Sequence, residues 1–151
     1  MELIGQFKVY RNDEIITFNN DIVVVGKNQL LDVMFNATAA SSWYVSLIST
    51  LTTLSADDTM ASHAGWSEYA SYNEGTRPIW NPGAAAAKVV TNTTLVEFTS
   101  TETFTLKGIF IANSATKSEV ASTLWCTAQL PLAVEYVNAD VVKVKYTLTI
   151  R

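Results

Sequence analysis

The chain has 151 residues, of which 48% are hydrophobic and 16% are charged, and its formal net charge is −4. A chain of this length fits a single domain over residues 1–151 that buries roughly 68–70% of its unfolded surface, so a core can form without disulfides. Ten Lys and Arg residues are scattered among 14 acidic ones, which argues against a nucleic-acid partner. Every apolar run falls short of the ~18 residues that cross a membrane, so we expect no membrane partner. The charged N-terminus lacks an apolar signal segment, which predicts folding in a cytoplasm.

Short segments in which apolar and polar residues alternate recur along the chain and predict β-strands. The expected strands are, in chain order, residues 4–10, 14–18, 22–25, 43–48, 88–91, 95–99, 103–112, 121–128, 133–137 and 142–151. The alanine run 84–87 favours a helix on propensity alone. Because it directly follows Pro82-Gly83 and is too short for an amphipathic helix, we expect an extended segment there.

One helix is expected early in the chain. Gly26 ends the preceding strand, and Asn28 suits the N-cap position of a helix. Apolar residues then recur at helical spacing, namely Leu30, Leu31, Met34 and Phe35. The sequence therefore predicts a short helix over residues 29–35 that covers one end of the sheets.

Two expected strands have informative faces. In 142–151, Val142 and Val144 belong to an apolar face that alternates strictly with a polar one, as in a strand with one face in water. In 103–112, Gly108 interrupts an apolar face and predicts a bulge or a close backbone approach, with a bulky side chain such as a tryptophan over it. That face comprises Phe104, Leu106, Gly108 and Phe110. About nine or ten short strands with one helix predict an all-β fold, an antiparallel β-sandwich of jelly-roll or immunoglobulin-like type.

Residues 55–83 escape the strand pattern and form a long irregular loop, and such loops tend to be either functional or disordered. The aromatic residues of this loop argue against disorder, because each has a large apolar area that is costly to leave in water. They must pack against the sandwich or against a neighbouring subunit, where Trp, Tyr and Arg often dominate binding. The residues expected to organise the loop or to form an interface are Asp58, His63, Trp66, Tyr69, Tyr72, Arg77 and Trp80.

The loop also holds the only concentrated set of ionisable residues. An enzyme hypothesis uses His63, the only histidine, as a general base, with Asp58 orienting its ring and Arg77 holding an anion. No nucleophile motif accompanies them and their spacing matches no zinc signature, so we expect no catalytic residue, no metal and no cofactor. A calcium site formed by Asp57, Asp58 and Glu74 is an alternative, although the spacing of an EF-hand is absent.

A structural role explains the same residues more simply. Asp58 can accept hydrogen bonds from backbone amides and hold a turn, and His63 can donate to a backbone carbonyl. Arg77 can stack on an aromatic face while it pairs with Glu74 or Glu68. In this interpretation the residues fix the shape of the loop.

Five segments resemble, in this order, a family of small tailed-bacteriophage proteins grouped with virion structural genes: GKNQLLDVMF, SWYVSLI, DDTMASHAGWSEYASYNEGTRPIWNPG, FTLKGIF and DVVKVKYTLTI. The resemblance covers most of the chain from Gly26 onward. Its most specific part combines Asp58-Thr59, Ser62-His63, Gly65-Trp66, Tyr72, Arg77 and Trp80, a combination that no general requirement of a β-sandwich dictates. Ser46 departs from the pattern of the family, where glycine is expected. The resemblance implies a place in a virion.

These observations lead to the hypothesis of a non-enzymatic virion structural protein that is assembled in the cytoplasm of a bacterial host. The leading hypothesis is a capsid decoration, or cement, protein that binds the lattice of major capsid protein and stabilises the shell. We expect a homo-oligomer whose weak contacts combine through avidity. One alternative is a neck or tail ring or fibre-attachment component bound to other virion proteins. Another is a glycan- or receptor-binding module with Trp66 or Trp80 exposed. Residues 1–18 form either an exchanged arm or ordinary sandwich strands.

Overall fold

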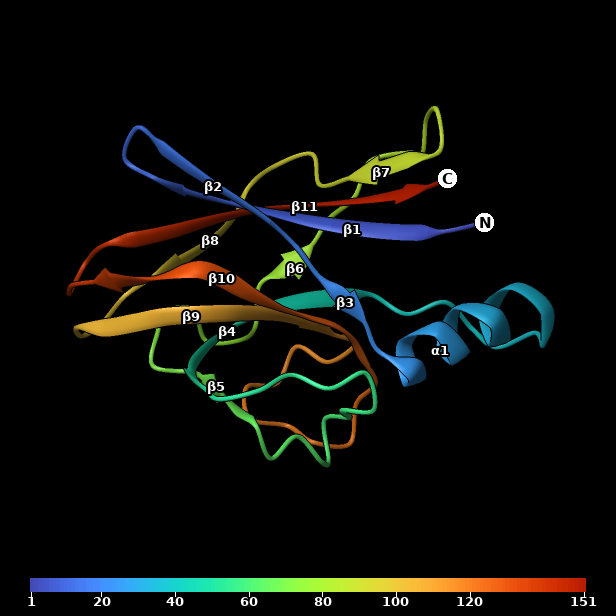
Figure 1. The fold of residues 1–151 in the computed structure, drawn as a ribbon, viewed down its shortest axis with the longest axis horizontal. Coiled ribbons are helices and arrows are strands. Elements are labelled where there is room, and N and C mark those ends of the chain that lie inside the picture. Colours follow the sequence, from blue (N-terminus) through green and yellow to red (C-terminus); the bar gives the residue numbers. More distant parts are fainter.

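The computed structural model describes residues 1–151 and consists of two antiparallel sheets that pack face to face (Figure 1). One sheet has the strand order β2-β1-β11-β7, with β8 also paired to β11, and the other has the order β3-β10-β9-β4-β5, with β6 also paired to β4. The predicted all-β antiparallel sandwich is therefore confirmed. The elements are β1 (Leu3–Arg11), β2 (Glu14–Asn19), β3 (Asp21–Ile22), α1 (Val24–Phe35), β4 (Trp43–Leu51), β5 (Trp66–Tyr69), β6 (Ile79–Trp80), β7 (Val89–Thr91), β8 (Val96–Thr99), β9 (Phe104–Ala112), β10 (Leu124–Tyr136) and β11 (Val141–Ile150).

The N-terminal segment is an ordinary part of the first sheet. β1 pairs with β11 over residues 3–10 and with β2 on its other side. The two chain ends lie side by side (Figure 1), and the backbones of Glu2 and Arg151 exchange two hydrogen bonds. Of the two alternatives for residues 1–18, the structure shows sandwich strands built into the sheet of their own chain.

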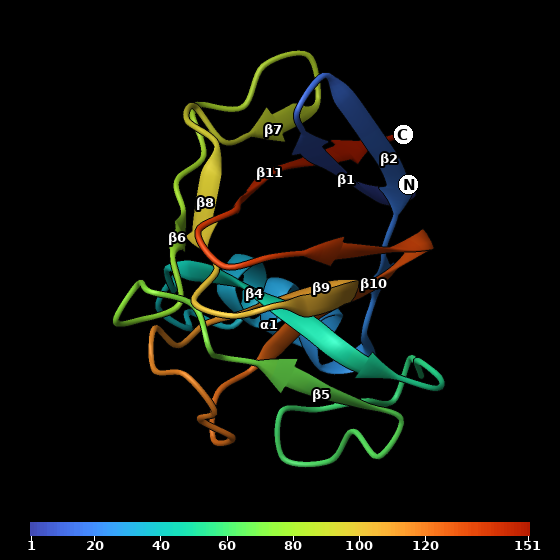
Figure 2. The ribbon, with the colours of Figure 1, turned by 90° about the vertical axis from the view of Figure 1, so that its left-hand side faces the viewer.

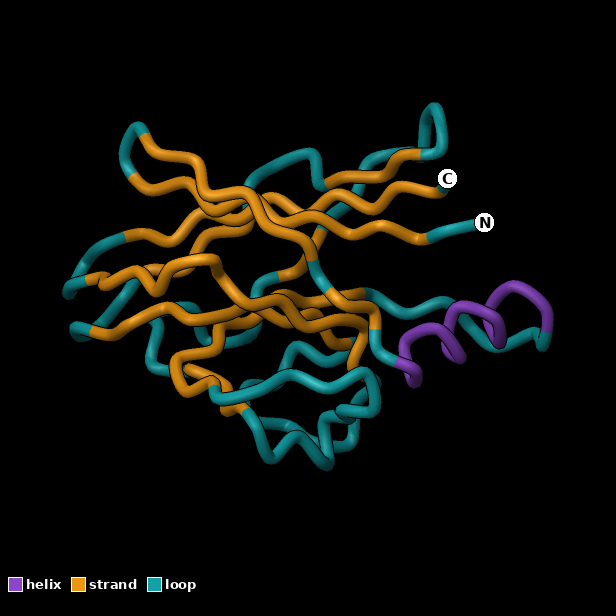
Figure 3. Tube along the Cα trace, viewed as in Figure 1, coloured by secondary structure: helices purple, strands orange, loops and turns teal.

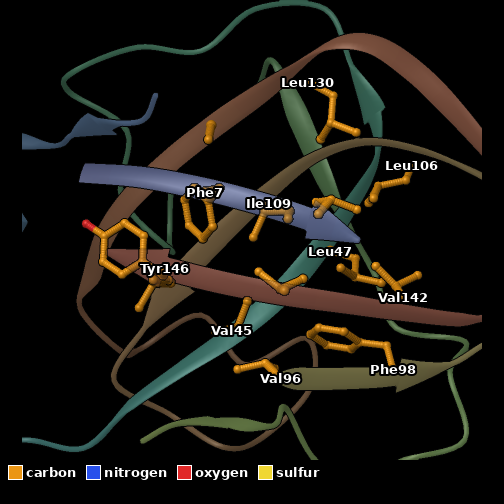
Figure 4. Close-up of a cluster of buried hydrophobic side chains, with 14 of the residues drawn as sticks. Phe7, Val45, Leu47, Val96, Phe98, Leu106, Ile109, Leu130, Val142 and Tyr146 are labelled. Carbon is orange, nitrogen blue, oxygen red and sulfur yellow. The ribbon is translucent and has the colours of Figure 1, made fainter. Parts of the chain in front are cut away.

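Inward-facing side chains of both sheets meet in a main core of 24 buried residues. Figure 4 shows part of this core, with Phe7 and Tyr146 from the first sheet facing Val45 and Ile109 from the second. A second cluster of seven buried residues lies on the opposite face of β4 and β9. Its members are Val23, Ile48, Met60, Trp66, Phe110, Ala112 and Leu124. The second sheet is therefore buried on both faces, and its outer face is covered by loops.

The helix starts earlier than the prediction of residues 29–35. α1 begins at Val24, so it takes over the end of the predicted strand 22–25. Asn28 lies inside the helix, which corrects its prediction as an N-cap; no side chain caps the first turn. The predicted end of the helix at Phe35 is confirmed.

Contact with β10 sets this early start. Val23 precedes the helix in an extended conformation, is fully buried, and its amide donates to the carbonyl of Trp125 at 3.1 Å. A Cβ atom at Gly26 would lie 2.5 Å from that same carbonyl oxygen, so the first turn of α1 packs directly against the backbone of β10. Tertiary contacts of this kind override local propensity.

A single strand, β10, replaces the two strands predicted at 121–128 and 133–137. Its register against β9 shifts between Gln129 and Val134. Pro131 lies inside this shifted stretch, where a residue without a backbone N–H is tolerated. The prediction was wrong because a bulged strand and two separate strands give the same interrupted pattern.

Gly108 of β9 allows the close backbone approach that its position predicts. A Cβ atom there would lie 2.6 Å from the carbonyl oxygen of Ala128, and the nearest bulky side chain is Ile48 instead of a tryptophan. The predicted shared face of β9 also breaks at this point. Leu106 belongs to the main core, whereas Phe110 belongs to the second cluster.

Two short strands interrupt the loop predicted at 55–83. β5 pairs with one end of β4, and β6 pairs with the other end, where Trp80 lies opposite Trp43. The turns before β5 and the connection between β9 and β10 gather on the outer side of the second sheet (Figure 2). The alanine run 84–87 forms no helix, but the predicted extended segment ends in a tight turn at Ala87 and Lys88, both of which have positive φ.

Candidate functional site

A buried ion pair organises the loop. Arg77 is 1% exposed, and its Nε and Nη2 atoms donate to the two carboxylate oxygens of Glu68 on β5 at 2.9 and 2.7 Å. The guanidinium also donates to the backbone carbonyls of Ser114 and Glu119, both at 3.2 Å, and lies 5.3 Å from the centroid of the Phe110 ring. The planar fork of arginine suits this bidentate contact. Arg77 therefore ties β5 to the connection between β9 and β10.

Glu68 gathers further donors around this pair. The hydroxyl of Ser46 donates to its carboxylate at 2.7 Å, and the amide of Ser118 does so at 2.9 Å. The Ser46 hydroxyl, which glycine would lack, also lies 3.3 Å from the hydroxyl of Tyr72. Burial raises the pKa of Tyr72 to about 12. The Lys117 ammonium completes the network, since it donates to the Tyr72 carbonyl at 2.8 Å and lies 3.9 Å from the centre of its ring.

Asp58 and His63 both contact Trp66 and hold its indole in place. Oδ2 of Asp58 accepts hydrogen bonds from the Trp66 indole and from the amide of Ser55, each at 3.0 Å. Nδ1 of His63 lies 2.8 Å from the Trp66 carbonyl oxygen, and its ring stacks on the indole with 3.9 Å between centroids. The enzyme hypothesis requires Asp58 to orient the His63 ring. In the structure Asp58 binds the Trp66 indole instead.

The remaining predicted site residues pack inside the sandwich. Tyr69 stacks on Phe104 with ring centroids 3.9 Å apart, and the Trp80 indole donates to the carbonyl of Tyr146 at 3.3 Å. All seven predicted residues except His63 are buried. Their contacts fix the loop within its own chain, so a contact surface for a partner must be sought elsewhere.

The carboxylates considered for calcium binding are held by other groups. Both oxygens of Glu74 lie within hydrogen-bond distance of the Thr99 amide, at 3.1 and 3.0 Å, and Asp58 holds the indole of Trp66. No group of three or more His, Cys, Asp or Glu side chains is placed to hold a metal ion. The structure therefore gives no support to that alternative.

Burial disfavours the ionised, reactive forms of two potential nucleophiles, the Cys126 thiol and the Tyr146 hydroxyl. Cys126 is fully buried, and burial raises the pKa of its thiol to about 12. Burial also raises the pKa of Tyr146 well above its ordinary value, and its hydroxyl accepts hydrogen bonds from Trp125 at 2.9 Å and Asn20 at 3.2 Å. The thiolate and the phenolate are the reactive forms, so neither side chain is activated.

A cluster of exposed apolar side chains lies on the helix, away from all the predicted site residues. Residues 24–40, which we call the α1 lobe, comprise α1 and the start of the following loop. The helix projects beyond the strands at one end of the molecule (Figure 3). Leu31 is 53% exposed, Met34 is 63% exposed and Phe35 is 79% exposed. The signal was in the sequence, because the helix is apolar in more directions than one covered face requires.

A cavity of about 160 Å³ lies between the inner side of α1 and the sandwich. Eight of its ten lining residues are hydrophobic. Trp43, Trp80 and Trp125 contribute to its walls, and Leu30 and Val33 line it from the helix. The cavity is therefore an apolar site of the size that accepts a small ring.

Comparison with known proteins assigns no family. No protein-family model matches the chain, and no curated protein is significantly similar to it. The single helix, α1, is too short to span a membrane.

Proposed function

We propose that this chain is a non-enzymatic structural protein of a bacteriophage virion, and that it is a capsid decoration protein. In this role it binds the lattice of major capsid protein and stabilises the shell. The resemblance of five sequence segments to small virion proteins supports the virion assignment. The structural observation that carries the proposal is the α1 lobe, an apolar helix that projects from a sandwich and is left partly uncovered.

A protruding apolar surface suits a protein that works in an assembly. Exposed apolar residues that cluster on one segment mark protein contacts more often than isolated ones do. Leu31, Met34 and Phe35 form such a cluster. The charged residues Arg77, Glu68 and Asp58 of the central loop instead make contacts within the chain. A loop held by internal contacts and a helix with an exposed apolar side fit a rigid domain that binds other subunits of an assembly through the helix.

The glycan-binding alternative loses its main support in this geometry. Trp66 is 3% exposed and Trp80 is 8% exposed, so neither indole presents a face for stacking on a sugar ring. A neck or tail ring component is the second candidate, because a projecting helix also suits contacts between subunits of a ring. The number of copies in the particle separates the two.

The test is the position and copy number of the chain in purified virions, measured by cryo-electron microscopy and quantitative mass spectrometry. A decoration protein occurs at a stoichiometry close to that of the major capsid protein. A ring component occurs at about a dozen copies or fewer, because a closed ring at one vertex has few positions. Such a low count contradicts the decoration proposal, and absence from virions contradicts any virion role.

A further inference from the structure

α1 is apolar on two opposite sides. Leu30 packs on the main core and, with Val33, lines the cavity beneath the helix. At 100° per residue, Leu31 and Phe35 fall on the side of the helix that faces away from this cavity, and both are exposed. Helices that are hydrophobic all round are normally buried all round. The outer side of α1 therefore requires cover that its own chain does not provide.

The cavity is also incomplete. Its volume of about 160 Å³ is close to that of an engineered apolar cavity of ~150 Å³ that binds benzene. Three tryptophans line it, and Gln29 and Ser41 are its two lining residues that are not hydrophobic. This lining favours an apolar ring and offers little to a charged ligand.

The same chain supplies a ring of matching size. Phe35 is the last residue of α1 and the most exposed apolar side chain outside the N-terminal methionine. A phenylalanine side chain has roughly 150–250 Å² to bury, so the 79% that is exposed here corresponds to roughly 120–200 Å². Phe35 cannot fill the cavity of its own chain, because it lies on the opposite side of the helix from Leu30 and Val33.

We propose that copies of this chain bind each other through the α1 lobe, with the Phe35 ring of one copy seated in the tryptophan-lined cavity of another. A patch that complements a pocket elsewhere on the same molecule is the basis of such self-association. A stable interface buries about 800 Å² on each partner. Leu31 and every residue from 34 to 40 are also exposed. The neighbours of Phe35 can therefore extend the contact toward this size. Phe35 then acts as the central anchor of the interface.

The first experiment measures self-association of the purified full-length chain by sedimentation velocity over a range of concentrations. We expect wild type to associate, and Phe35→Ser to weaken association at least ~10-fold, the effect typical of a central anchor. Leu132→Ser is the matched control, because Leu132 is 77% exposed but lies on β10, outside the α1 lobe. It should associate like wild type. A wild-type chain that stays monomeric, or equal effects of the two substitutions, would overturn the proposal.

A mixing experiment tests the contact itself. Ala40 is exposed and lines the cavity, so Ala40→Phe should place a ring at its mouth and block it without disturbing the core. Phe35→Ser lacks the ring but keeps the cavity, and Ala40→Phe lacks the cavity but keeps the ring. Each variant alone should associate poorly, whereas an equimolar mixture should recover association. No recovery contradicts a contact between Phe35 and the cavity.

Benzene is the probe for the cavity alone. It should raise the Tm of Phe35→Ser, whose cavity is free, and have less effect on Ala40→Phe. Benzene binding to a wild-type chain that remains monomeric would show that the cavity accepts a ring which Phe35 of another copy does not supply, and would overturn the contact between copies. The proposed function also relies on the α1 lobe, but its test is the copy number in virions, so failure of one proposal can be told from failure of the other.

Discussion

Replacing Arg77 by methionine tests whether the buried ion pair holds the loop. The substitution keeps an apolar side chain over Phe110 but leaves the Glu68 carboxylate, 7% exposed, without its cation. Removing one partner of a buried pair typically costs about 3–5 kcal/mol. Domains of this kind have a total free energy of unfolding of about 5–15 kcal/mol, so the loss is a large share of it. With ~2–4 °C per kcal/mol for a chain of this size, Tm should fall by roughly 6–20 °C.

Urea denaturation at neutral pH measures this loss, and the chain provides its own control. Lys143 and Glu97 form a surface pair at 3.5 Å, with their side chains 46% and 54% exposed. Lys143→Met should therefore change the free energy of unfolding by less than about 1 kcal/mol. Adding Glu68→Gln to Arg77→Met should recover part of the loss, because the uncompensated charge disappears. Equal, small effects of Arg77→Met and Lys143→Met would refute the assignment of the pair as the organiser of the loop.

Three further predictions concern packing and titration. Gly26→Ala should destabilise the chain by about 1–3 kcal/mol although alanine favours helices, because the new Cβ meets the β10 backbone, whereas Gly75→Ala, with open space around it, should not; thermal unfolding compares them. Cys126 should resist thiol reagents until the chain unfolds, which labelling with and without denaturant measures. Burial raises the pKa of Tyr72 and Tyr136 from 10.0 to about 12, so the folded state binds more protons between these values. Stability should therefore fall as pH rises from 10 to 12, with tyrosinate absorbance appearing together with unfolding.

The fold class was predictable because a sandwich leaves a local trace in the sequence. Val142, Val144 and Tyr146 alternate with polar residues, and they are the fully buried side chains of β11. The alternation predicted the strand without any long-range contact. The start of α1 was not predictable in this way, because it depends on the approach of Gly26 to the backbone of β10, a contact between distant parts of the sequence.

The network around Arg77 was predictable in kind but not in detail. An arginine that stacks on an aromatic ring and pairs with an acid followed from residue types alone. The choice of Glu68 over Glu74 depends on the fold, since β5 brings Glu68 beside the guanidinium and the Thr99 amide holds Glu74. Spacing along an irregular loop contains no such information.

The aromatic residues of the central loop form no interface, for a related reason. Aromatic residues in the central loop indicated large apolar areas that needed cover, and the chain itself covers Trp66 and Trp80. Composition states how much surface must be buried but not which molecule buries it. Helical periodicity is more informative, because it fixes directions: at 100° per residue, Leu30 and Phe35 lie about 140° apart around the axis of α1 and cannot both face one sheet. The side of α1 that bears Leu31 and Phe35 is therefore an apolar surface that the chain itself leaves uncovered.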